Sequence, residues 1–367
     1  MIHPQGEMKK REEAVVWPGA SLETFAGKVE VKWQPEGAVS TFGQMAYFIE
    51  FLKVSGLFAE WVEKCPLEYR SGNAPQKRDV LGTLLLAVLG GCRRYAHISG
   101  PRGDGVNPGL LGMTKVMSED SVRRALLGIE EEAGERWLRE SLQRSYAPLL
   151  EEPWVLDMDS TVKVLYGHQE GAVRGYNPGK PGRPSHVYHS YLLANVRIVL
   201  DVEVQAGNQT ASSYAQPGLW KLLDGLDERQ TPAFLRGDCG WGTERAMEGA
   251  EQRSLAYVLK LKQTGGVKKL LERYCGGGGW SDAGQGWEGV SAQLRLIGWS
   301  RERRVILLRR KLSDSRVQQV EKREKKKAGQ MDLNLPEVMH RGIRYEYAVL
   351  VTSMRDEVRT VAQHYRD

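Results

Sequence analysis

The segment Val155-Leu156-Asp157-Met158-Asp159-Ser160-Thr161 follows Pro153, where a helical pattern gives way to short β-type runs. Side chains alternate between the two faces of a strand, so both aspartates share one face while Leu156 and Met158 share the other. Two carboxylates held together favour a bound cation. Mg²⁺ (or Mn²⁺) takes oxygen ligands and retains several waters, as a phosphoryl-transfer site requires. The segment therefore predicts a metal site or, alternatively, a solvated acidic strand end.

A second acid follows another short apolar run. In Arg236-Gly237-Asp238-Cys239-Gly240-Trp241, the residues 233–235 deliver Asp238 to a glycine-flanked turn before a helix. Flanking glycines allow a sharp turn and the close approach of a bulky ligand. Asp-x-Gly also occurs in ordinary turns, so the motif alone leaves both interpretations open.

The pattern after Pro153 predicts the fold class. β-type runs and helical stretches follow in the order strand, hairpin, helix, strand, helix, strand. The runs are 154–159, 187–194, 198–205, 233–238 and 255–261, and the helical stretches are 212–226 and 243–253. This order predicts an α/β fold, a ribonuclease H-like mixed sheet with helices, in which acids cluster at neighbouring strand ends. Fold order alone does not determine function.

Composition and periodicity divide the chain into five parts. We predict an N-terminal arm, a helical domain, the ribonuclease H-like core, a β-rich insertion, and a return strand (345–352) with the start of a helix (356–367). Their bounds are 1–41, 42–150, 151–263, 264–336 and 337–367. The charged run 321–327 is either an exposed linker or a phosphate-contacting arm.

Two basic segments are candidates for contact with a nucleic-acid backbone. Ser118 can cap a helix that carries Arg123 and Arg124, which either face DNA or solvate one helix face. The Gly/Pro-rich stretch 167–184 carries Arg174, Lys180 and Arg183 and is predicted to lack regular structure. Its cations either meet phosphates or belong to a plain crossover loop.

Composition narrows the class of protein. Lys plus Arg is 52 against 46 Asp plus Glu, a net charge of +6 that suits a polyanionic partner without proving one. No apolar run is long enough to span a membrane, and the first residues lack an export signal, so we expect a cytoplasmic, nucleoid-associated protein. The 4 cysteines form no CxxC pair, which disfavours a zinc ribbon or a disulfide framework.

Several ordered motifs resemble those of the DDE transposases of bacterial insertion sequences, in the group whose first motif has the form DxDST. The resemblance extends from about Phe42 to the last residue and includes Arg94-Tyr95-Ala96-His97-Ile98 and 118–126. The motifs are Asp157-x-Asp159-Ser-Thr, Gly167-x-Gln169-x-Gly171-Ala, Gly175-Tyr-Asn-Pro-x-Lys180-x-Gly-Arg183, Gly207-Asn208 and Arg236-x-Asp238-x-Gly240.

The resemblance implies DNA transposition by metal-dependent phosphodiester hydrolysis and strand transfer at the insertion-sequence ends. Asp159 and Asp238 match the first two catalytic, metal-binding acids, and Asp157 is the second choice for the first acid. The implied cofactor is Mg²⁺ or Mn²⁺. The implied partner is double-stranded DNA, namely terminal inverted repeats and target DNA, and the implied active state is a homodimer.

The third acid of this family is a glutamate in a Tyr-x-x-Arg-x-x-x-Glu pattern. Tyr365-Arg366-Asp367 fits its opening, and the arginine and the glutamate would fall one and five residues beyond Asp367. Glu346 and Glu357 do not stand in this pattern. We therefore expect a truncated transposase that is inactive alone. The alternatives are a non-catalytic DNA-binding remnant that occupies transposon ends or modulates intact transposase, and a ribonuclease H-like nuclease unrelated to transposition.

Overall fold

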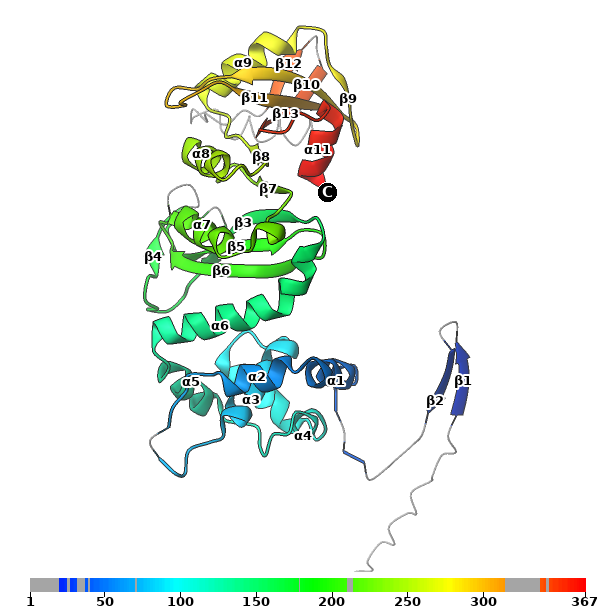
Figure 1. Ribbon diagram of the computed structural model, residues 1–367, viewed down its shortest axis with the longest axis vertical. Helices are drawn as coiled ribbons and strands as arrows, with labels where there is room; N and C mark the ends of the chain where they lie inside the picture. Colours follow the sequence, from blue (N-terminus) through cyan, green and yellow to red (C-terminus); the bar gives the residue numbers. More distant parts are fainter. Residues whose placement is uncertain are drawn as a thin grey trace, which may run out of the picture. The chain divides into compact units, whose positions relative to one another are not determined.

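A computed structural model of the chain divides into two compact units, Met1–Ser141 and Leu142–Asp367 (Figure 1). It describes residues 20–24, 27–31, 37–38, 40–69, 71–177, 179–209, 214–313, 337–340 and 343–367. Most of the predicted arm 1–41 and the whole charged run 321–327 lie outside the described residues. In the described part of the chain, no helix combines the length and the apolar character needed to cross a membrane.

The described residues of the first unit are helical apart from a short antiparallel hairpin, as the periodicity of residues 42–150 predicts. Its elements are β1 (Ala20–Thr24), β2 (Gly27–Val31), α1 (Met45–Ser55), α2 (Leu57–Glu63), α3 (Lys77–Leu89), η1 (Tyr95–Gly103), α4 (Asn107–Leu110), α5 (Glu119–Leu127) and the start of α6 (Glu131–Tyr146). Trp61 and Trp137 stack at 5.2 Å between ring centroids, and the Trp137 indole donates to the Trp61 carbonyl at 2.8 Å. This contact ties α6 to α2.

The second unit is built on one mixed sheet, 11-stranded among the described residues. The strand order is β4-β5-β3-β7-β8-β13-β11-β10-β9, with β6 beside β5 and β12 beside β13. β3, β7 and β8 are mutually parallel, and the other pairs are antiparallel. The strands are β3 (Val155–Val164), β4 (Val173–Arg174), β5 (Pro184–Leu193), β6 (Ile198–Ala206), β7 (Phe234–Gly237), β8 (Tyr257–Lys260), β9 (Ser281–Gly284), β10 (Trp287–Leu294), β11 (Arg303–Lys311), β12 (Glu337–His340) and β13 (Ile343–Thr352).

Helices cover the two faces of this sheet unequally. What we call the major face carries Leu156, Leu235, Leu259, Val305 and Val349, whose side chains pack with α7, α8 and α9 in the larger core. The opposite face, called the acidic face, carries Asp157, Asp159, Phe234, Arg236 and Asp238, and α11 packs on its apolar part. The helical elements are η2 (Ala147–Glu151), α7 (Gln216–Asp224), η4 (Glu228–Gln230), α8 (Glu244–Gln252), α9 (Gly265–Cys275) and α11 (Val358–Arg366).

The mixed α/β class predicted from the sequence is confirmed, and several details differ. The stretch 167–184 holds a short strand, β4, which pairs with β5 because residues 173 and 174 meet the start of that strand. Region 264–336 begins with a helix, α9, whose apolar positions Val267, Leu270 and Leu271 pack into the larger core. The strands of this region extend the core sheet, and the compact units separate after Ser141.

Candidate functional site

Asp159 and Asp238 follow a registered pair on two neighbouring parallel strands. Met158 of β3 is aligned with Gly237 of β7, so the two aspartates are the next residues along each chain. Neighbouring strands lie about 4.8 Å apart. Both aspartates are exposed. The sequence-predicted pair is therefore brought to one edge of the acidic face from separate strands.

Local hydrogen bonds orient each of these carboxylates. One oxygen of Asp159 accepts from its neighbour Ser160 N at 2.8 Å, and one oxygen of Asp238 accepts from Gly240 N at 2.8 Å. The turn after Asp238 is fixed by Trp241. Its backbone N–H donates to the Asp238 carbonyl at 3.0 Å, and its side chain is fully buried. Each acid keeps oxygen lone pairs directed to solvent.

Asp157 lies on the same face but has a different environment. Its two oxygens accept from Arg236 Nε at 3.2 Å and Nη2 at 3.1 Å, a bidentate ion pair between aligned residues of β3 and β7. The Arg236 side chain is only 12% exposed. The ion pair with Arg236 distinguishes Asp157 from Asp159, a distinction that their spacing in the sequence could not provide.

The C-terminal helix α11 reaches the same region. The third nitrogen of Arg236, Nη1, donates to the His364 carbonyl at 3.0 Å, and the Phe234 and His364 rings lie 5.0 Å apart. Tyr365 is close enough that burial, followed by the negative charges of Asp238, Cys239 and Asp157, raises its pKa to about 12. Figure 1 shows α11, in red, standing beside β9 and β10. The end of α11 therefore borders the acids.

The donor chemistry of Asp159 and Asp238 fits a hard divalent cation. Both are exposed carboxylates, and within the described ranges neither one forms an ion pair with a cationic side chain. Such an ion takes carboxylate oxygens and completes its shell with water. The same ranges hold no group of three or more histidine, cysteine, aspartate or glutamate side chains placed to bind a metal. The described part thus offers two candidate ligands for such an ion.

The five basic residues predicted to contact DNA fall into three places. Arg123 and Arg124 lie on α5 and both pair with Asp120, at 2.6 and 2.8 Å, while the Ser118 hydroxyl caps that helix by accepting from Ser121 N. Arg174 is exposed on β4.

Lys180 and Arg183 both lie over the exposed ring of Tyr166, at 5.0 and 5.4 Å from its centroid. The Lys180 ammonium also hydrogen-bonds the Tyr166 hydroxyl. That hydrogen bond is the main cause that lowers the pKa of Tyr166. The ring thus organises two cations on one exposed loop.

Some motif residues have a structural explanation. A Cβ added at Gly175 would lie 1.8 Å from the Gly207 carbonyl oxygen, so the two motifs that contain these glycines meet backbone to backbone. Ser160 bonds the buried His189 at 2.9 Å on the major face. Sequence inspection missed His189 and the role of Arg236. Arg236 lies two residues before Asp238, and this strand period was the signal for a shared face.

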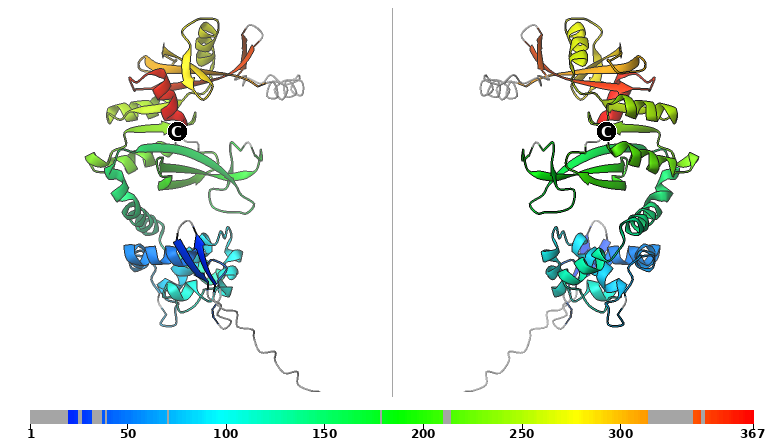
Figure 2. Two further views of the ribbon diagram at one scale, coloured as in Figure 1. Left: turned by 90° about the vertical axis from the view of Figure 1, so that its right-hand side faces the viewer. Right: turned by 90° about the vertical axis from the view of Figure 1, so that its left-hand side faces the viewer.

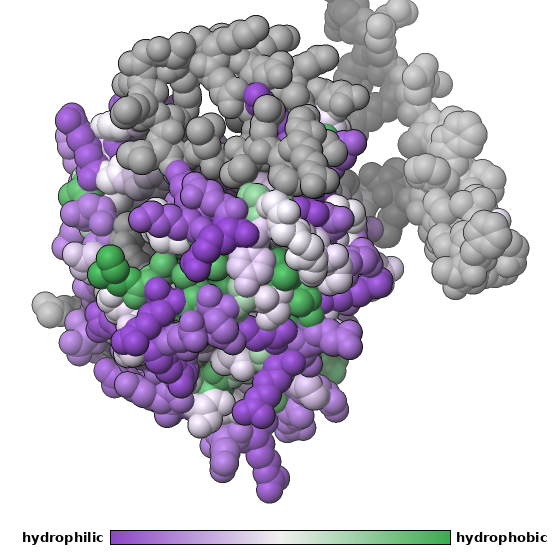
Figure 3. All heavy atoms as spheres, turned by 90° about the horizontal axis from the view of Figure 1, so that it is seen from above, coloured by the Kyte–Doolittle hydropathy of each residue, from purple (hydrophilic) through white to green (hydrophobic). Residues whose placement is uncertain are grey.

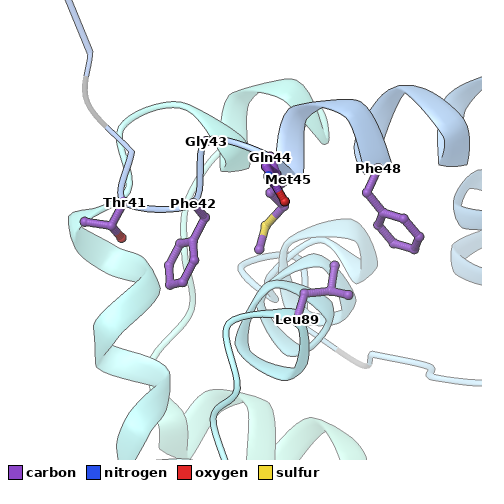
Figure 4. A pocket seen from close by; sticks show the side chains of 7 residues that line it. All are labelled: Thr41, Phe42, Gly43, Gln44, Met45, Phe48 and Leu89. Atoms are coloured by element: carbon purple, nitrogen blue, oxygen red, sulfur yellow. The ribbon is translucent and has the colours of Figure 1, made fainter. Parts of the chain in front are cut away.

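An apolar pocket of about 440 Å³ lies in the first unit (Figure 4). Phe42, Met45, Phe48 and Leu89 supply its apolar lining, and no carboxylate lines it. The described part of the face drawn in Figure 3 is mainly hydrophilic with a smaller group of apolar residues.

Acids from separate strands of a mixed sheet define a candidate site for metal-assisted chemistry, and comparison with known families identifies the class. Residues 108–317 match the family model of transposase DDE domain group 1. The chain therefore belongs to the DDE-domain transposase family. No curated protein matches the chain.

Two solved structures are similar to the chain at low identity. One is a piggyBac transposase synaptic complex with hairpin DNA, at 11% identity and a TM-score of 0.37, covering 91% of this chain and 59% of that chain. The other is a Mos1 transposase paired-end complex with the left transposon end, at 14% identity and a TM-score of 0.20, covering 60% of this chain and 67% of that chain. The chain thus spans less than two thirds of the piggyBac protein it matches.

Proposed function

We propose that this transposase-family chain acts on DNA at insertion-sequence ends by metal-dependent phosphodiester hydrolysis followed by strand transfer. The observation that carries the proposal is that Asp159 and Asp238 each directly follow the aligned pair Met158 and Gly237 of the parallel strands β3 and β7. The strand order β6-β5-β3-β7-β8 supports a ribonuclease H-like core, since a hairpin pair and two parallel strands flank the first acid.

In this proposal Asp159 and Asp238 hold Mg²⁺ or Mn²⁺, which when bound supplies Lewis-acid charge stabilisation at the phosphoryl oxygens. The two exposed carboxylates bind the ion and leave space for phosphate because they lie just past the last aligned pair of β3 and β7. The Asp238 turn is rigid, since Trp241 anchors it in the core. That rigidity keeps the second acid beside the first.

A third acid completes the proposed site from outside the described residues. The end of α11 borders the two aspartates, so a glutamate carried by a continuation of this helix would approach them from the acidic face. A homodimer on paired DNA ends is the proposed active assembly.

DNA contact is assigned to Arg123, Arg124, Arg174, Lys180 and Arg183. All five are exposed, and Lys180 and Arg183 are held together over Tyr166. Backbone contacts of this kind release counterions, so the affinity for terminal inverted-repeat DNA should fall steeply with salt. The Asp120 pairs of Arg123 and Arg124 make those two the weaker contributors.

The proposal is tested by extending the chain beyond residue 367 with a helical tail carrying the Arg and Glu of the family pattern. Metal-dependent cleavage of inverted-repeat DNA should then appear in the extended protein. Asp159→Asn and Asp238→Asn should each reduce it by at least about 100-fold, because each removes a metal ligand. Asp227→Asn, an exposed acid elsewhere in the second unit, is the matched control. Full activity in either site variant would refute the assignment.

A non-catalytic role is the second candidate, favoured by the presence of only two converging acids within the described residues. Such a protein would occupy transposon ends or modulate intact transposase. It predicts a mobility shift with inverted-repeat DNA in the absence of metal, unchanged by Asp159→Asn. Continued inactivity of the extended protein, with binding retained, would favour this role.

A further inference from the structure

Arg236 uses all three guanidinium nitrogens within the acidic face. Nε and Nη2 donate to the two Asp157 oxygens, and Nη1 donates to the His364 carbonyl. Its side chain is 12% exposed while that of Asp157 is 37% exposed. Bidentate pairing of this type fixes both side chains in one orientation. One residue therefore connects β7, β3 and the last turn of α11.

The Arg236 guanidinium compensates the negative charge of Asp157, whereas Asp159 forms no ion pair within the described residues. The two aspartates are two residues apart on one strand face, yet only Asp157 is aligned with Arg236. The arginine fork compensates the charge of this carboxylate and fixes its orientation, so a turn of Asp157 toward a metal would weaken these bonds and leave a largely buried guanidinium poorly paired at high cost. Asp157 is thus bound to Arg236 in preference to an ion.

The contact with α11 is compatible with a longer helix. The His364 carbonyl lies in the final turn, where carbonyl groups lack a following amide partner and attract cations. A carbonyl oxygen carries two lone pairs, so it can accept from Arg236 and from a later helical amide together. Arg236 can therefore hold α11 whether or not the helix continues.

From these contacts we infer that Arg236 is a positioning residue, which holds Asp157 out of the metal-binding pair and fixes the end of α11 beside Asp159 and Asp238. Asp157 is the anchor of Arg236 and is not a metal ligand. This inference rests on the proposed metal site for its first half. Its second half, the attachment of α11, depends only on the contacts of Arg236.

Mn²⁺ binding to the full chain, followed by electron paramagnetic resonance of the free ion, tests the first half. Arg236→Met should strengthen Mn²⁺ binding several-fold because it leaves the Asp157 charge unpaired, and Asp157→Asn should weaken it because it leaves the Arg236 charge unpaired. The double variant Asp157→Asn/Arg236→Met removes both charges, so its Mn²⁺ affinity should return to within about threefold of the original. A purely structural arginine would not give this pattern.

If Asp157 is a ligand, the double variant binds Mn²⁺ as weakly as Asp157→Asn, and the inference is overturned. Asp159→Asn is the reference for a lost ligand. Should Asp159→Asn leave Mn²⁺ binding unchanged, the proposed metal site itself fails. The two failures are therefore distinguishable.

Hydrogen exchange of the α11 amides tests the second half without any metal. Arg236→Met should increase exchange in 358–366 at least about tenfold while the β11 and β13 amides stay protected, since only the local anchor is lost. Arg236→Lys should restore part of the protection by donating to the His364 carbonyl. Unchanged exchange in α11, or equal loss of protection across the sheet, would overturn the role of Arg236 as an anchor.

Discussion

The two faces of the second unit's sheet differ in what they bury. The major face packs Leu156, Leu235 and Val305 under three helices and also buries the Arg303 guanidinium between two glutamates of α8. The acidic face buries a smaller apolar cluster under α11 and leaves Asp159 and Asp238 exposed where the pairing of β3 with β7 ends. Figure 2 shows the helices α7, α8 and α9 and the red α11 from two further sides.

Residues on the major face therefore stabilise the fold, whereas those on the acidic face include the proposed metal ligands, and one layer of backbone carries both. Each strand residue on the major face has a neighbour on the acidic face, because side chains alternate. Leu156 and Asp157 are such neighbours, as are Leu235 and Arg236. Substitutions on the two faces should therefore have different consequences even between adjacent residues.

The largest effect is expected for Arg303→Met on the major face. Arg303 is 2% exposed and pairs with Glu244 at 2.6 Å and Glu251 at 2.7 Å, so its loss leaves two poorly solvated carboxylates. Breaking a buried pair in this way costs about 3 to 5 kcal/mol of unfolding free energy. Denaturant unfolding measures it. Arg301→Met is the control, because Arg301 is 60% exposed and its pair with Glu251 should contribute less than about 1 kcal/mol. Equal losses in both variants would contradict the buried network.

Neighbouring substitutions on β3 test the separation directly. Leu156→Ala should lower the unfolding free energy by about 3 kcal/mol, because it opens a cavity in the larger core. Asp159→Asn should change stability by less than about 0.5 kcal/mol, as an exposed substitution does, while it removes Mn²⁺ binding. Both are measured by urea unfolding and Mn²⁺ titration. A strongly destabilised Asp159→Asn protein would show that the two faces are not separable.

Periodicity predicted most of the fold because the decisive signals were local. Leu156 and Met158 alternate with the aspartates, and the strand lies where that pattern places it, although it continues to Val164. The helix α9 was missed because the glycines and tryptophans of the surrounding region suggested strands, whereas Val267, Leu270 and Leu271 carry helical spacing.

The site was only partly predictable for a physical reason. Alternation puts Asp157 and Asp159 on one face, but the choice between them depends on Arg236, which is 79 residues away in sequence. Register between two parallel strands is set by tertiary packing and cannot be derived from either segment alone. The carbonyl of His364, 128 residues from Arg236, is a still longer-range partner. Roles of this kind require the assembled sheet.

The acid stability of the major face should depend on Glu251. Burial raises its pKa, but hydrogen bonds from Arg303, Arg301 and Tyr257 outweigh burial and lower it from 4.5 to about 2. A lowered pKa contributes stability above the unfolded value of 4.5, and that contribution is lost as pH falls toward 2. The loss is up to about 3 kcal/mol. Unfolding measured from pH 5 to pH 2 should show it.

Glu251→Gln provides the matched comparison for this acid dependence. It should be less stable at pH 6 and should lose less stability between pH 4.5 and 2, because no carboxylate remains to be protonated there. If Glu251→Gln lost as much unfolding free energy between pH 4.5 and 2 as the original protein, the acid dependence would arise from other groups.

The smallest effect is expected from His189, which lies on the major face behind Asp159. Burial lowers its pKa, and the hydrogen bonds to Gln209 and Gln205 oppose that shift only in part. The folded state therefore favours the neutral ring, so stability is present above the ordinary His pKa of 6.5 and declines as pH falls below it. Unfolding free energy should decrease slightly between pH 7 and pH 5, before the Glu251 contribution is affected.

His189→Gln isolates this contribution because glutamine can accept from Ser160 and donate to the Gln209 carbonyl without titrating. Its unfolding free energy should be flat between pH 7 and pH 5, and the exposed His168→Gln serves as control. Mn²⁺ binding by Asp159 should be unaffected in both, since the ring and the carboxylate project from opposite faces of the sheet. A change in Mn²⁺ binding with His189→Gln would mean that a substitution on the major face alters the metal site through the Ser160–His189 hydrogen bond. The two faces would then not be independent at Ser160.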